Sequence, residues 1–140
     1  MLQSFRGKHP RVDPSAYVHP SATLIGDVEV GARASIWPGV VLRGDDGPIV
    51  IGEDTSIQDG TVVHCTESLP TVVGDRCVVG HNAHLEGCTV ESHCLIGSGS
   101  VVLRDSYLWS VPVIRSLLET VRLGSTVTFD SMAANIDVKD

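Results

Sequence analysis

Imidazole, carboxylate, guanidinium and amide side chains gather in the middle of this 140-residue chain. His64 and His81 stand out among the histidines, because acidic, basic and amide residues accompany both of them in the repeat described below. Imidazole nitrogens and carboxylate oxygens are ligands of catalytic zinc, and a zinc ion with an open coordination position can activate water. Whether these groups can meet depends on the elements that carry them.

Large apolar residues recur every six positions over residues 12–106, with short slips, and a smaller residue usually follows each of them four positions later. A helix repeats at about 3.6 residues and a strand at about 2, so a period of six fits neither. It fits short strands joined by turns, with three hexads to a coil. We therefore predict an all-β solenoid, with an inward-facing set that includes Val12, Val18, Leu24, Val30, Ile36, Ile51, Ile57, Val73, Val79, Val90 and Ile96.

Counting hexads places polar residues of successive coils in columns. Arg43, His64 and Glu86 each follow the first residue of a hexad, and these hexads are one coil apart. At a strand spacing of about 4.8 Å their side chains can touch. A second set, on the neighbouring face, consists of Gln58, Asp59 and His81. One chain thus carries two halves of a site around a corner, and a trimer can place one half against the other half of a neighbour.

Two hexads are longer than the rest. The hexad that begins at Leu42 has three extra residues, and the one that begins at Val63 has four. Because these hexads are one coil apart, both extensions fall on the same face. Insertions into a solenoid usually form loops on one face, and such a face often binds ligands.

Over residues 12–106 the repeat resembles the hexapeptide-repeat family, whose fold is a left-handed parallel β-helix. Within it the chain is similar to the γ-class carbonic anhydrases. The matching text is Arg43-Gly44-Asp45, Ile51-Gly52, Ile57-Gln58-Asp59, Val63-His64, Val79-Gly80-His81-Asn82-Ala83 and Gly87-Cys88. This resemblance implies a homotrimer that hydrates CO2 reversibly to bicarbonate at a metal ion between subunits. In the family this metal is zinc, or iron under anaerobic conditions.

The resemblance also implies roles for individual residues. His64 and His81 match two of the three histidine ligands, which adjacent subunits contribute. The candidate catalytic residues are Arg43, Asp45, Gln58 and Asp59. In the family the Arg/Asp pair supports the subunit interface, and the glutamine orients the metal-bound water. The metal lowers the pKa of that water, so that hydroxide can attack the carbon of CO2.

The third ligand position departs from the family pattern. The family's third histidine lies five residues after the one that matches His81, and this chain has Glu86 there. Two histidines and one glutamate form a known catalytic zinc set, so Glu86 can complete the site. His84, two residues earlier and on the same outward side, is a second candidate. The third alternative is that the metal is lost and the fold serves as a scaffold or a small-molecule binder.

Composition and charge narrow the classes of partner. The formal net charge is −7 with no Lys/Arg block, which disfavours nucleic acids and anionic membranes. No apolar run approaches the roughly 18 residues of a membrane span, and the start of the chain lacks a secretory signal, so we expect a cytoplasmic protein. An acyltransferase is a weaker alternative, because basic residues and extended loops that hold acyl-CoA are missing. Without a Cys-x-x-Cys pair, the four cysteines are expected to be free thiols.

The chain is interpreted as a single domain, residues 1–140, because it is too short for two domains of ordinary size. The repeat fades after residue 106, which leaves a divergent C-terminal segment, 107–140. Pro112 in a first turn and Gly124 just past an end predict a helix over 110–124. Its apolar stripe would consist of Val113, Ile114, Leu117, Leu118 and Val121. No counterpart in the family is evident for the tail, 125–140.

Overall fold

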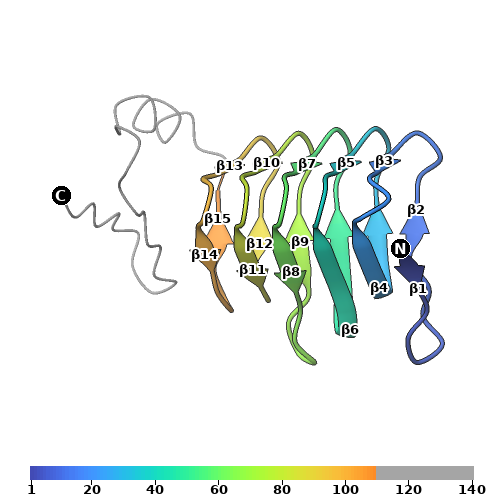
Figure 1. Ribbon diagram of the computed structural model, residues 1–140. Coiled ribbons are helices and arrows are strands. Elements are labelled where there is room, and N and C mark those ends of the chain that lie inside the picture. Colours follow the sequence, from blue (N-terminus) through green and yellow to red (C-terminus); the bar gives the residue numbers. More distant parts are fainter. Residues whose placement is uncertain (110–140) are drawn as a thin grey trace.

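Parallel pairing of short strands, stacked coil upon coil, builds the part of the chain that is described, residues 1–109. In this computed structural model the chain winds into a left-handed β-helix with three faces (Figure 1). All the strand pairs formed by residues 1–109 are parallel, and each strand pairs with strands one coil away. The prediction of a left-handed parallel β-helix is confirmed.

Each coil contributes one strand, or half of a long bent strand, to each face. The first face contains β1 (Leu2–Gln3), the start of β4 (Thr23–Val30), the start of β6 (Val41–Ile51), β8 (Val62–His64), β11 (His84–Glu86) and β14 (Val101–Val102). The second face contains β2 (Arg11–Val12), the ends of β4 and β6, β9 (Thr71–Val73), β12 (Thr89–Val90) and β15 (Tyr107–Leu108). The third face contains β3 (Tyr17–Val18), β5 (Ser35–Ile36), β7 (Ser56–Ile57), β10 (Val78–Val79) and β13 (Leu95–Ile96).

The large residues of the hexads form the core, as predicted. On the third face Ile36, Ile57 and Val79 lie in register on neighbouring strands and are fully buried. Val12 and Val18, on the first coil, are only partly buried. Alternation along each strand sends the intervening side chains outward, so one short strand supplies one core residue and leaves its neighbours for the surface.

Two threonines occupy the small inward position, and both are fully buried. Thr55 Oγ1 donates to the backbone oxygen of Gly74 at 2.6 Å, and Thr61 Oγ1 donates to that of Gly80 at 2.8 Å. Each hydroxyl oxygen also accepts a backbone N–H from the next coil, at 3.0 and 3.3 Å. Burial of these hydroxyls is therefore compensated by hydrogen bonds, and the same bonds tie successive coils together.

All four cysteines are free thiols, as predicted. Cys65, Cys77 and Cys88 are buried, and Cys94 is half-buried. Residues 1–109 include no helix long and apolar enough to cross a membrane. The helix predicted over 110–124 and the tail after it lie outside the described residues.

Ile57→Asp should prevent folding. The substitution would bury an unpaired carboxylate at a position that is fully enclosed. Such a charge costs about 3–5 kcal/mol, which is comparable with the whole stability of a small domain. We expect the β-type circular dichroism spectrum and the cooperative urea transition to be lost. Val101→Asp is the control, because Val101 is 60% exposed on β14; a parent-like urea midpoint for Ile57→Asp would show that this side chain does not face the core.

The thiols should react slowly in the folded protein. Burial raises the pKa of Cys94 to about 11, with help from neighbouring Cys77 and Glu91, and burial raises that of Cys88 to about 11. At pH 8 this leaves about 100-fold less thiolate, the reactive form, than at an ordinary cysteine. Alkylation followed by mass spectrometry should show slow modification that speeds up as pH rises toward 10, and fast modification of all four cysteines in guanidinium. Modification of half-buried Cys94 at the rate of a free thiol would contradict this.

Candidate metal centre

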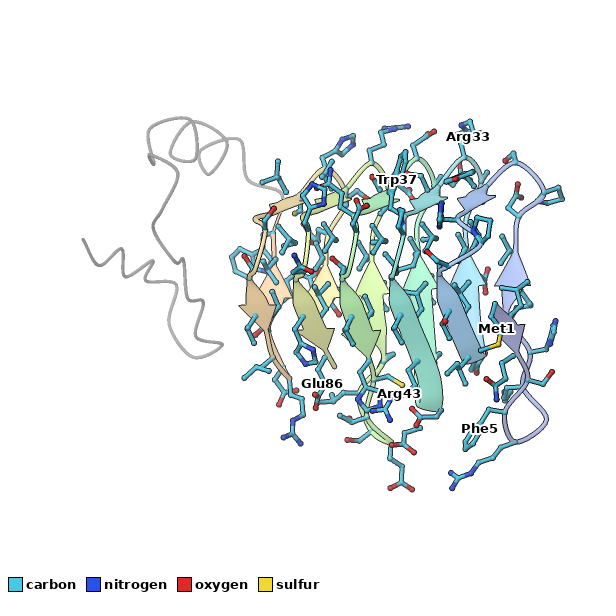
Figure 2. The ribbon with its side chains drawn as sticks, viewed as in Figure 1. Met1, Phe5, Arg33, Trp37, Arg43 and Glu86 are labelled. Atoms are coloured by element: carbon cyan, nitrogen blue, oxygen red, sulfur yellow. The ribbon has the colours of Figure 1, made fainter. Side chains whose placement is uncertain are left out.

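The first predicted column of polar residues is present on the first face. Arg43 pairs in register with His64 on the neighbouring strand, and His64 pairs with Glu86 on the next. Figure 2 shows the side chains of Arg43 and Glu86 along the same edge of this face. His64, between them, is mostly buried, with 15% of its side chain exposed. The hexad count therefore placed these three residues correctly.

Asp45 holds this column together. One of its carboxylate oxygens lies 3.0 Å from Nε2 of His64, and the other lies 3.5 Å from a guanidinium nitrogen of Arg43. Burial acts to raise the pKa of Asp45, but hydrogen bonds from its own backbone N–H and from His64, together with the charge of Arg43, outweigh that effect and lower it. Asp45 is therefore ionised at neutral pH. The Arg43 and Asp45 pair that the resemblance implied is in contact within one chain.

The loop that carries Asp45 is fixed by close packing between coils. A Cβ atom at Gly44 would lie 2.5 Å from the backbone oxygen of Asp27, and one at Gly47 would lie 2.7 Å from that of Thr66. Only glycine fits such approaches. The two lengthened hexads, predicted to lie on one face, therefore touch each other at the corner between the first and second faces.

Thr71 fixes the backbone at the end of β8. Its buried hydroxyl donates to the backbone oxygen of His64 and accepts the backbone N–H of Gly87 at 2.8 Å. Thr71 directly follows the lengthened loop 65–70, so these bonds hold the end of the loop next to His64. His64 is thus held at its ring by Asp45 and at its backbone oxygen by Thr71.

The second predicted set lies at the opposite edge of the first face, at the corner that leads in from the third face. Nδ1 of His81 lies 3.2 Å from a carboxylate oxygen of Asp59, and both side chains are about half exposed. Gln58, beside Asp59, follows the last residue of β7. The structure therefore brings His81 to Asp59, but within one chain it leaves His81 on the other edge of the face from His64.

Both candidates for the third ligand lie on β11. Nε2 of His84 lies 3.5 Å from one carboxylate oxygen of Glu86, and Nε of Arg104 lies 3.5 Å from the other. Arg104 was not among the site residues predicted from the sequence. Hexad counting contained a signal for it, because Arg104 follows Val102 at the same interval at which Gly87 follows Leu85, which places it next to the end of β11.

The side chains that are present fit a zinc ion. His64 and Glu86 on adjacent strands offer an imidazole and a carboxylate, and His81 offers a second imidazole at an edge where a neighbouring subunit can meet it. Two nitrogens and one carboxylate oxygen form a catalytic zinc set. Each histidine already has a carboxylate beside it, and such partners orient ligating imidazoles.

Comparison with known proteins supports the same family. Residues 70–104 match the family model described as bacterial transferase hexapeptide (six repeats). The chain is 47% identical over 108 residues to gamma carbonic anhydrase 2, mitochondrial, of Arabidopsis thaliana, covering 73% of this chain and 39% of that protein. It is 39% identical over 114 residues to the carnitine operon protein CaiE of Escherichia coli K12, covering 81% of this chain and 58% of CaiE. The chain thus spans less than two thirds of these relatives.

Solved structures agree with the fold and the family. A hexapeptide transferase family protein from Anaplasma phagocytophilum is 37% identical with a TM-score of 0.67, and the match covers 76% of this chain and 73% of that one. A candidate acetyltransferase from Bacillus cereus is 34% identical with a TM-score of 0.75, covering 76% and 62% of the two chains. The repeat, the fold and these similarities together show that the chain belongs to the hexapeptide-repeat family and is a γ-carbonic anhydrase-like member of it.

Proposed function

We propose that this chain forms a γ-carbonic anhydrase-like metalloprotein that hydrates CO2 reversibly to bicarbonate. The metal, zinc or alternatively iron, is shared between two subunits of a homotrimer. The observation that carries the proposal is the placement of His64 and Glu86 on one edge of the first face and His81 on the other. The cytoplasmic location expected from the sequence is kept as part of the proposal, although the Arabidopsis relatives are named mitochondrial.

In this proposal His64 and Glu86 of one subunit and His81 of the next hold the metal. A bound zinc ion acidifies a water molecule and so supplies the nucleophile for CO2 at neutral pH. Asp45 and Asp59 orient the two imidazoles, from 3.0 and 3.2 Å. Gln58 offers an amide to position the reacting water, and Arg43 keeps Asp45 in place.

Arg104 offsets the charge of Glu86, which the family lacks at this position. A carboxylate brings a negative charge where the family has a neutral imidazole. The Arg104 guanidinium, 3.5 Å from one Glu86 oxygen, compensates part of that charge and leaves the second oxygen toward His84. Partners of ligating carboxylates orient them and tune their binding strength.

The contacts of Glu86 also favour one alternative. Both of its oxygens already face cationic or donor groups, an arrangement that a purely structural ion pair would share. In that case the trimer is a metal-free scaffold or a small-molecule binder. Acyl transfer, suggested by the name of the Bacillus cereus structure, is the weaker alternative, because this chain offers no cluster of basic side chains for acyl-CoA phosphates.

Glu86→His should increase zinc binding about tenfold and increase CO2 hydration, because imidazole restores the family ligand without the extra negative charge. The parent, with its carboxylate, should be more active at alkaline pH than at neutral pH. His84→Ala should have little effect. Metal content by plasma mass spectrometry and stopped-flow CO2 hydration measure both properties, and Glu53→His, at an exposed corner, is the matched control.

Two outcomes would change the assignment. If His84→Ala abolishes zinc binding while Glu86→Ala leaves it intact, His84 is the third donor. If neither the parent nor Glu86→His holds stoichiometric metal, the scaffold alternative replaces the enzyme.

Light scattering at micromolar concentration should give three times the chain mass. His64→Ala and His81→Ala should each lose CO2 hydration as pure proteins. When the two variants are mixed, refolded and assembled at random, about one quarter of the interfaces combine an intact His64 edge with an intact His81 edge. Activity should return to about that level. A monomer mass, or no recovery in the mixture, would exclude a site shared between subunits.

A further inference from the structure

A second group of metal-ligand side chains lies within a single chain. The donor atoms of Asp45, His64 and Cys65 all lie within 4.8 Å of one another, the one such group of three that residues 1–109 contain. We propose that these three side chains form an intrachain site for a thiophilic divalent cation. This site differs from the shared site, because it needs no neighbouring subunit and uses a sulfur ligand. It does not depend on CO2 hydration.

The distances are close to those of a metal site. A zinc ion has ligands at about 2.0–2.3 Å, so the donor atoms around it are about 3.5 Å apart in a tetrahedron. Nε2 of His64 and Oδ1 of Asp45 are already 3.0 Å apart. The donor atoms of the remaining pairs lie within 4.8 Å of each other, so they need to approach by about 1.3 Å at most.

Burial and the charges of Asp45 and Asp46 raise the pKa of the Cys65 thiol, so Cys65 binds as a thiolate only when the metal displaces its proton. Its sulfur accepts the backbone N–H of Gly47 at 3.1 Å and donates to the backbone oxygen of Gly47 at 3.0 Å. The first bond can persist when sulfur binds a metal, and hydrogen bonds to ligating sulfurs support metal sites. The proton of the second bond is the one that metal binding releases to solvent. The S–H bond breaks, the sulfur–metal bond forms, and no redox change is required.

The surroundings match the charge of a divalent cation. A thiolate and the Asp45 carboxylate together carry two negative charges, and the imidazole of His64 is neutral when it ligates. Sulfur with nitrogen and oxygen favours zinc, cobalt, cadmium or copper over magnesium and calcium. The side chains of His64 and Asp45 are 15% and 20% exposed, so these two ligands can be reached from solvent, while Cys65 is buried.

His64 belongs to both sites, which links them. A chain that holds a cation with Cys65 uses Asp45 and Nε2 of His64 as ligands, and so loses the contact that orients this ring toward a metal shared with a neighbour. The intrachain site can therefore load a single subunit before assembly, and the shared site competes with it afterwards.

Cobalt titrated into metal-free protein tests the proposal. Cobalt bound to a thiolate gives a near-ultraviolet sulfur-to-metal charge-transfer band, whereas cobalt bound only to nitrogen and oxygen does not. We expect the band in the parent and its loss in Cys65→Ser, whose hydroxyl can keep both hydrogen bonds to Gly47. Cys88→Ser, at another buried thiol, is the matched control and should keep the band. His81→Ala, which destroys the shared site, should also keep it.

Asp45→Asn provides a second test that leaves the core intact, and it should weaken cobalt binding about tenfold or more. A parent without the band, whether or not it binds cobalt, overturns the proposal. So does a band that persists in Cys65→Ser. The proposed function fails separately, through the absence of CO2 hydration or of zinc held by His81, so the two failures can be told apart.

Discussion

In-register hydrogen bonding between successive coils is the constraint on which the rest of this structure depends. Along the first face the N–H of Val41 donates to Thr61, that of Val62 to Ala83 and that of His84 to Ser100. In each bond the acceptor is the residue that precedes the in-register partner on the next strand, so every coil repeats the position of the one before it. Core rows and polar columns then follow together. A single shift would break both, because the two kinds of side chain alternate on the same strands.

The same constraint explains how much could be predicted from the sequence. The inward residues mark where each hexad begins. Counting hexads from them therefore predicted the core and the column of His64 and Glu86. It could not give contacts made by long side chains or by the loops. Arg104 reaches Glu86 on the preceding coil through a long, flexible side chain. Cys65 lies in the lengthened hexad that begins at Val63, where the regular period is interrupted, so its approach to Asp45 depends on how two loops pack.

The two histidines and the glutamate of the half-sites each lie against a side chain that can pair with them. His64 faces Asp45, His81 faces Asp59, and Glu86 faces Arg104. These pairs set the direction of the rings and the carboxylate before any metal arrives. At the intrachain site they also impose a cost on metal binding, because there Nε2 of His64 must leave the Asp45 carboxylate or share it with the metal. The charge that surrounds each ligand is therefore part of the affinity of the site.

Three hexads to a coil also limit how such a chain can change length. Removal of one hexad between His64 and Glu86 would move every later residue on by one face, and the carboxylate would leave the histidine's column. Removal or duplication of a whole coil would leave the columns aligned. Extra residues of other lengths can be accommodated only where they bulge outward at a corner, as in the loop 65–70. Natural insertions and deletions in proteins of this shape should therefore come as complete coils or as corner loops.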